Sequence, residues 1–254
     1  TVVGNLIGTA VNGTSALPNL TSGLRIQGGN NTIGGTTAAH RNVISGNTVH
    51  GVQLTSATAT GNTIIGNYIG VDQTGAAALA NGMGVNIQVS ATGNTIGGTT
   101  VGSANVISGN MGDGIRITNA PGNTVAGNRI GIAGGSSAPI ANGQNGIRIQ
   151  GASSTNNVIG GITSDAANLI YNSALRGVTL EATAGAGNSI LRNSISASGN
   201  LGIDLNNDGL TANDANDVDG GSNNRQNFPL LFNAQVLGAT TRVVGLLQTE
   251  ASKS

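Results

Sequence analysis

One short pattern recurs seven times along this chain: a glycine followed by two aliphatic residues that a single polar residue separates. The first copy is Gly23-Leu24-Arg25-Ile26, the last is Gly202-Ile203-Asp204-Leu205, and successive copies begin 25 to 33 residues apart. Alternation of apolar and polar residues is the period of a β-strand with one buried face. Self-similarity at this spacing is typical of a stacked repeat, in which each unit packs on its neighbours. The sequence therefore predicts a β-solenoid with one such strand in every coil.

Two further phrases, both led by asparagine, lie between the glycine-led strands. One is Asn31-Thr32-Ile33-Gly34-Gly35, which has similar copies in the later coils. The other, in alternate coils, is Asn42-Val43-Ile44-Ser45-Gly46-Asn47. Asparagine tolerates left-handed backbone and bonds to nearby backbone groups, which suits corners, and stacked asparagines can bond along a ladder. Crossovers between parallel strands are nearly always right-handed. We predict an all-β, right-handed parallel β-helix of about seven to eight coils, with residues 71–82 and 134–145 bulging as loops.

Composition removes several classes of function. Charged residues make up 8% of the chain, aromatic residues make up 2%, and the formal net charge is zero. Without a basic stripe, nucleic-acid binding has no electrostatic basis, and no run of 18 apolar residues is present to span a membrane. A surface rich in Thr, Ser, Asn and Gly and poor in Lys is typical of an exported protein. Residues 1–8 already read as the middle of a repeat, so we expect a trimmed piece of a longer protein.

The asparagine-led and glycine-led phrases, in this order, resemble the repeats of bacterial right-handed parallel β-helix surface proteins of the pectate-lyase-like superfamily. The resemblance covers most of the chain and implies a β-helix over residues 1–231, with an acidic closing segment at 202–231. Residues 242–247 are similar to the first strand of a small β-sandwich that often follows. The tail at 232–254 is therefore expected to begin a further β domain or to be a strand donated to a neighbour. The superfamily includes adhesins, fibres and polysaccharide enzymes, so the resemblance implies a fold more than an activity.

The polar residues of the glycine-led strands are expected to form one outward face, because alternate residues of a strand point to opposite sides. The candidate ligand-binding residues of this face are Arg25, His50, Gln53, Asn86, Asp113, Arg116, Arg148 and Arg176. Amides and guanidinium groups in a row can hydrogen-bond sugar hydroxyls or carboxylates. A soluble solenoid also needs polar residues at its outward positions, and we favour this simpler explanation. The face lacks the paired carboxylates of a hydrolase, so we assign no catalytic residue.

The closing segment is acidic. Five of the ten acidic residues lie between Asp204 and Asp219, and Asp204-x-Asn206-x-Asp208-Gly209 matches the opening of a calcium loop. Ala215 stands where an EF-hand has its bidentate glutamate, so the segment is not an EF-hand. The candidate ligands of a structural calcium ion are Asp204, Asn206, Asp208, Asp214 and Asp217. The alternative is an acidic cap that only solvates the end of the solenoid.

Two functions remain. Uniform repetition, with no local breach of the pattern to mark a site, favours a non-enzymatic structural or adhesive module of an exported bacterial cell-surface or extracellular fibre protein. A solenoid end exposes unpaired strand edges and needs a cover, so we expect copies of the chain to assemble head to tail. The alternative is a β-helix that binds or cleaves polysaccharide with the face carrying Arg25, Arg116, Arg148 and Arg176.

Overall fold

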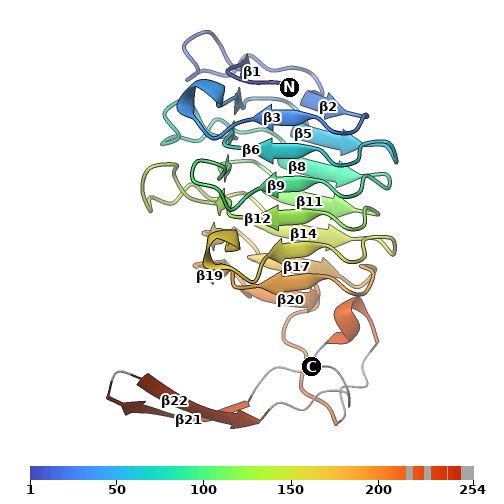
Figure 1. Cartoon of the computed structure of the whole chain (residues 1–254), viewed down its shortest axis with the longest axis vertical. Coiled ribbons are helices and arrows are strands. Elements are labelled where there is room, and N and C mark those ends of the chain that lie inside the picture. Colours follow the sequence, from blue (N-terminus) through green and yellow to red (C-terminus); the bar gives the residue numbers. More distant parts are fainter. Residues whose placement is uncertain (216–219, 226–229, 239, 247–254) are drawn as a thin grey trace.

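The chain forms a parallel β-helix of about seven coils, as the repeat predicts (Figure 1). This computed structural model describes residues 1–215, 220–225, 230–238 and 240–246. Each coil contributes a strand to each of three parallel sheets, so every third strand in the sequence lies side by side in space. The prediction of an all-β solenoid is therefore confirmed.

Three parallel sheets run the length of the stack. The glycine-led sheet consists of β2 (Ser22–Ile26), β5 (His50–Thr55), β8 (Met83–Gln88), β11 (Ile115–Thr118), β14 (Ile147–Gln150), β17 (Val178–Glu181) and β20 (Ile203–Asn206). The Asn-Thr-Ile sheet consists of β3 (Thr32–Gly34), β6 (Thr63–Ile65), β9 (Thr95–Gly97), β12 (Thr124–Ala126), β15 (Val158–Gly160) and β18 (Ser189–Leu191). The Asn-Val-Ile sheet consists of β1 (Leu6–Ile7), β4 (Val43–Ile44), β7 (Tyr68–Ile69), β10 (Val106–Ile107), β13 (Arg129–Ile130), β16 (Leu169–Tyr171) and β19 (Ser194–Ser196).

The core is a set of aliphatic columns, because parallel pairing in constant register places like residues on top of one another. Val85, Ile115 and Ile147, for example, occupy one column of the glycine-led sheet, and all three are fully buried. Along each strand, the residues that alternate with these aliphatic residues face the outside of the stack. The inward and outward sides of these strands are therefore those that the sequence predicts.

Asparagine ladders hold the corners of the coils together. In each ladder, Nδ2 of one asparagine donates to Oδ1 of the asparagine one coil further toward the C-terminus, as Asn42 does to Asn67 at 2.8 Å. The first ladder contains Asn5, Asn42, Asn67, Asn105, Asn128, Asn168 and Asn193. The second contains Asn31, Asn62, Asn94, Asn123, Asn157 and Asn188. The third contains Asn19, Asn47, Asn81, Asn110 and Asn142.

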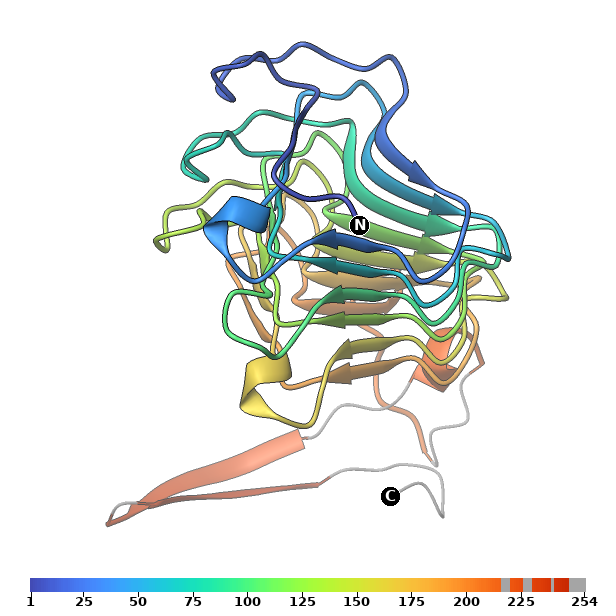
Figure 2. The ribbon, with the colours of Figure 1, turned by 45° about the horizontal axis from the view of Figure 1, so that its top comes forward.

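Loops protrude from one side of the stack (Figure 2). Residues 71–82 and 134–145 form two of them, as expected, with antiparallel bridges between Val71 and Ala78 and between Ile132 and Pro139. Three short 3₁₀ helices complete the described elements: η1 (Ala38–His40), η2 (Ser164–Ala166) and η3 (Ser222–Arg225).

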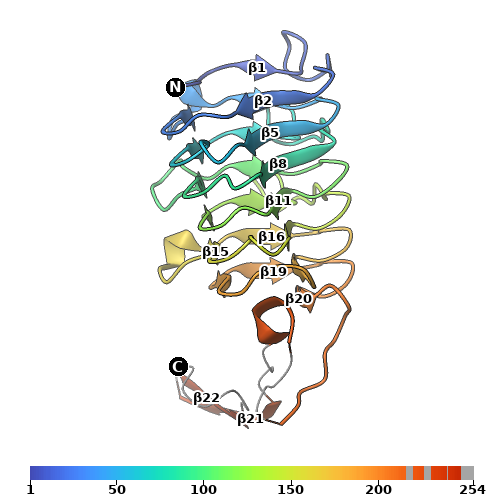
Figure 3. The same ribbon diagram turned by 90° about the vertical axis from the view of Figure 1, so that its right-hand side faces the viewer.

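An antiparallel hairpin lies beyond the C-terminal end of the stack, formed by β21 (Leu230–Leu237) and β22 (Thr240–Leu246) (Figures 1 and 3). Its residues are exposed. Whether this tail opens a further β domain or is donated to a neighbour stays a prediction. No helix in the described ranges is both long and apolar enough to cross a membrane.

Candidate functional sites: the outward face, the acidic segment and the N-terminal end

The structure brings the predicted ligand-binding residues onto one face of the glycine-led sheet. Strand pairing aligns five of them in a single row across neighbouring coils: Arg25, Gln53, Asn86, Arg116 and Arg148. The remaining three, His50, Asp113 and Arg176, lie at or just before the starts of strands in the same sheet. The alignment of these residues follows the predicted strand alternation, and their role in binding a ligand stays a prediction.

Ion pairs within the face engage three of its four arginines. Arg116 pairs with Asp113 at 2.6 Å and Arg148 pairs with Glu181 at 2.7 Å. The third pair joins Arg176 to Asp204, whose side chain is fully buried. These cations therefore have carboxylate partners inside the protein.

The sequence did not identify Glu181 as a partner of Arg148. Strand register places Arg148 beside Thr179, so Glu181 lies two residues further along the neighbouring strand. Long side chains reach such diagonal positions across a sheet. Only the register reveals this pair, because the two charged residues lie 33 positions apart in the sequence.

His50 lies in a hydrogen-bond chain at the N-terminal half of the face. The Ser22 hydroxyl is 3.2 Å from Nδ1 of His50, and Nδ2 of Asn86 is 3.2 Å from Nε2. Burial, and secondarily the positive charge of Arg116, lowers the pKa of His50 below its ordinary value of 6.5. The imidazole is therefore neutral at pH 7.

The direction of the hydrogen bonds around His50 decides what this histidine can do. The assigned amide orientation makes Nε2 of His50 an acceptor from Asn86, which leaves the ring proton on Nδ1. Nδ1–H then donates to the Ser22 hydroxyl, and that hydroxyl donates to Oε1 of Gln53 at 3.2 Å. A general base needs the opposite direction, in which it accepts the serine proton. This arrangement positions His50 without activating Ser22.

Several buried polar atoms of the face have no hydrogen-bond partner among the described residues. Oδ1 of Asn86, Nε of Arg148, Oγ1 of Thr179 and Oδ1 of Asp204 belong to this group. Arg148, Thr179 and Asp204 are neighbours in one row, on β14, β17 and β20. Buried groups of this kind are normally satisfied by ordered water or by a ligand.

The acidic segment begins with a carboxylate that is already engaged. Oδ2 of Asp204 accepts from Arg176 and from the backbone N–H of Gly209, the latter at 3.2 Å. Nδ2 of Asn206 donates to Oδ2 of Asp208 at 2.7 Å. Asp217 lies outside the described residues.

These contacts bear on the expected calcium ion. Calcium takes six to eight oxygen ligands, and within the described ranges no group of three or more His, Asp or Glu side chains gathers closely enough to hold a metal ion. The Arg176 guanidinium also neutralises Asp204. The described residues therefore do not by themselves form a calcium shell, and calcium binding by the whole segment stays a prediction.

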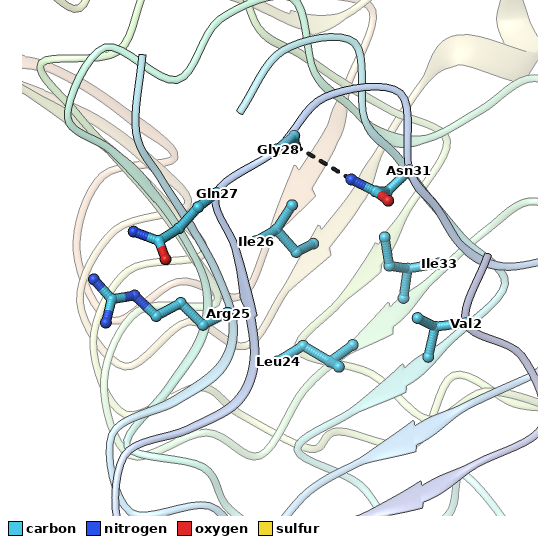
Figure 4. A pocket seen from close by; sticks show the side chains of 8 residues that line it. All are labelled: Val2, Leu24, Arg25, Ile26, Gln27, Gly28, Asn31 and Ile33. Carbon is cyan, nitrogen blue, oxygen red and sulfur yellow. Dashed lines mark hydrogen bonds between the residues drawn. The ribbon is translucent and has the colours of Figure 1, made fainter. Parts of the chain in front are cut away.

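A cavity of about 400 Å³ opens at the N-terminal end of the core (Figure 4). Leu24, Ile26 and Ile33 line it together with Val2, and these apolar side chains lie on the inner side of the coil. The side chains of Arg25 in β2 and of Gln27, directly after β2, lie on the outer side. The cavity is therefore the open end of the aliphatic columns, and the sequence gives no direct signal for it.

The chain was also compared with known proteins. No protein-family model, no curated protein and no solved structure matches it.

Proposed function

We propose that this chain is a non-enzymatic structural or adhesive module of an exported bacterial protein, either at the cell surface or in an extracellular fibre. The ion pairing of the outward face carries the proposal. Arg116, Arg148 and Arg176 are each paired with a carboxylate of the same face. Paired charges stabilise the sheet locally and leave fewer cations to attract a charged substrate.

The continuous ladders support the same role. Asparagine rungs and aliphatic columns repeat from the first coil to the last, so the coils form one uninterrupted rod. A rod of this kind holds whatever lies at its two ends at a fixed separation. The resemblance of the repeats to bacterial β-helix surface proteins of the pectate-lyase-like superfamily agrees with this role.

Incubation with a panel of neutral and uronate polysaccharides tests the proposal. We expect no release of new reducing ends or unsaturated products, since His50 does not accept a proton from Ser22 in the hydrogen-bond chain of the face. Product release that His50→Gln abolishes would contradict the proposal and favour a polysaccharide-cleaving enzyme.

A second candidate function is polysaccharide binding without cleavage. The row that begins with Arg25 favours it, because guanidinium and amide groups can hydrogen-bond sugar hydroxyls and carboxylates. The Arg25 side chain is exposed and has no hydrogen-bond or ion-pair partner among the described residues, so it is available to a uronate carboxylate.

A carbohydrate array tests this second candidate. Arg25→Gln should weaken binding of uronate polymers, whereas Arg192→Gln, an exposed arginine next to β18, should leave binding unchanged. Equal binding by both variants and the unaltered chain would argue against a site on this face.

A further inference from the structure

Threonine recurs at the outward position of the Asn-Thr-Ile sheet. Strand pairing aligns six residues of this sheet in one row across successive coils: Thr32, Thr63, Thr95, Thr124, Val158 and Ser189. The four threonines are partly exposed, and the aliphatic residue that follows each of them is buried in the core. This sheet therefore presents a row of threonine side chains to the outside of the stack.

A second row of threonines lies three residues earlier in the chain. Its members, also partly exposed, are Thr60, Thr92 and Thr155. Backbone hydrogen bonds between coils align this row as well, since Gly122 N donates to Thr155 O at 2.9 Å. Between the rows lie a glycine with left-handed backbone, such as Gly61 or Gly93, and a buried ladder asparagine. Few side chains therefore stand between the two rows, which together form the threonine face.

The hydroxyls of the threonine face are free. Within the described residues, no hydrogen bond engages the side-chain oxygen of any threonine in the two rows. Threonine is β-branched, so its side chain has few rotamers and its hydroxyl keeps a defined position. The face thus offers repeated donors and acceptors that lose little side-chain entropy on binding.

The surroundings of the threonine face carry no charge. The segments that form this sheet and the turn before each strand contain no Asp, Glu, Lys, Arg or His and no aromatic residue: 27–34, 58–65, 90–97, 119–126, 153–160 and 184–191. The glycine-led sheet, in contrast, carries four arginines at its outward face. A surface without charges or aromatic rings offers little to an ionic ligand or to a sugar ring, whereas its hydroxyls can hold water.

The second asparagine ladder keeps the threonine rows in register. Each of its rungs directly precedes a residue of the first row, as Asn62 precedes Thr63, and its amide bonds join successive coils at 2.8 to 3.3 Å. Ladders of side chains stabilise sheets that twist little. Figure 1 shows the strands β3, β6, β9 and β12 of this sheet stacked one above another. The hydroxyls therefore recur at the interval between neighbouring strands, about 4.8 Å.

From this regular, uncharged array we infer that the threonine face binds ice. Oxygen atoms recur along the rows of the ice lattice at nearly the strand interval, so water held by successive hydroxyls can join the lattice. The threonine methyl groups lie against the same water layer and add apolar contact. This function goes beyond the proposed structural or adhesive role and uses a different face from the one that carries Arg25.

Measurement of thermal hysteresis with the 254-residue chain tests the inference. Protein bound to an ice crystal lowers the temperature at which the crystal grows below the temperature at which it melts. We expect the unaltered chain to produce this gap and to give faceted crystals, and buffer alone to produce neither.

Two lysine substitutions in one coil separate the threonine face from the rest of the surface. Thr124→Lys places a strongly hydrated ammonium group in the first row and should abolish the gap. Thr118→Lys is the matched control, because Thr118 is also a partly exposed strand residue of this coil but belongs to the glycine-led sheet. This control should retain the gap of the unaltered chain. Circular dichroism checks that both variants fold.

Thr95→Gln covers the case in which a lysine variant fails to fold. Glutamine occupies outward positions of the neighbouring sheet at Gln53 and Gln88, so the fold accepts it. Its longer side chain stands above the first row and should also remove the gap.

Three results would overturn the inference. One is an unaltered chain that shows no gap, and another is an equal gap in Thr124→Lys and Thr118→Lys. The third is an unaltered chain that forms dimers in sedimentation velocity while Thr124→Lys stays monomeric, because the face would then be an interface between copies. A chain that neither binds ice nor releases sugar products would leave the structural role standing, whereas product release would contradict that role whatever happens with ice.

Discussion

Asparagine 105 shows what one corner residue does in this fold. Its Oδ1 accepts from the backbone N–H and the Nδ2 of Asn67, both at 3.0 Å, and its own Nδ2 donates to Asn128 and to Ile64 O. The side chain is fully buried. Each asparagine of this kind therefore satisfies backbone and side-chain groups of three coils, which explains why the residue recurs at the corners.

Replacing this residue tests the ladder. We expect Asn105→Ala to lower the free energy of unfolding by about 2 to 4 kcal/mol, because it leaves several buried donors and acceptors unpaired. Asn12→Ala, at an exposed loop position whose Oδ1 accepts one bond from Thr14, should cost less than about 1 kcal/mol. Denaturant unfolding measures both. Equal costs would mean that the ladder does not stabilise the fold.

Histidine 50 makes stability depend on pH in a predictable direction. Its pKa in the folded chain is lowered by burial and then by Arg116, so the unfolded chain binds the proton more readily. The contribution of neutral His50 to the free energy of unfolding is therefore fully present above the ordinary histidine pKa. It decreases as the pH drops below about 6.5.

Unfolding curves at pH 7.5 and at pH 5.5 measure this effect. The unaltered chain should be less stable at the lower pH, and His50→Gln should lose much of the difference. A variant with the same pH dependence as the unaltered chain would show that another group is responsible.

At the scale of the strand, the leading glycine is required by the distance between coils. An ideal Cβ at Gly84 would lie 2.3 Å from the carbonyl oxygen of Gly114, and one at Gly114 would lie 2.7 Å from that of Gly146. The backbone of the next coil leaves no room to relax. The repeated glycine is thus a packing requirement of stacked strands, which the sequence pattern indicates without giving its cause.

A central coil and the last coil provide a matched pair for this requirement. Gly114→Ala should destabilise the chain by about 3 kcal/mol, since overpacking against backbone cannot be relieved by a rotamer change. Gly202→Ala should stay within about 0.5 kcal/mol of the unaltered chain, as substitutions without a buried contact do. Thermal unfolding at a concentration at which the chain is monomeric measures both. A Gly202→Ala chain as unstable as Gly114→Ala would refute the explanation.

Element positions follow from the sequence wherever the repeat is regular. Alternation predicts the glycine-led strands, and the asparagine phrases predict the other two sheets. The closing coil is different, because Asn223 reaches the second ladder across residues that have no repeat spacing. The ion pair between Arg148 and Glu181 likewise cannot be predicted from the sequence, since it joins diagonal positions on neighbouring strands.

For the whole molecule, the repeat predicts the solenoid and composition predicts its small aliphatic core. Neither predicts which side chains of the outward face pair with one another, because every outward position of a solenoid is polar whether or not it binds a ligand. The membership of the face is therefore predictable from sequence, whereas its internal neutralisation by three ion pairs requires the structure.

Across the whole molecule, the two coils beside each coil hold it in place through the asparagine ladders and the aliphatic columns. No separate stabilising site is needed. Stability in such a stack is a sum of nearest-neighbour terms, so the ends open more readily than the middle. Amide hydrogen exchange, measured residue by residue on the monomeric chain, tests this most directly. The account predicts the slowest exchange in the central strands β10, β11 and β12, with protection that decreases toward Val2 and toward Ser196. Protection that is uniform, or that is greatest in one terminal coil, would contradict it.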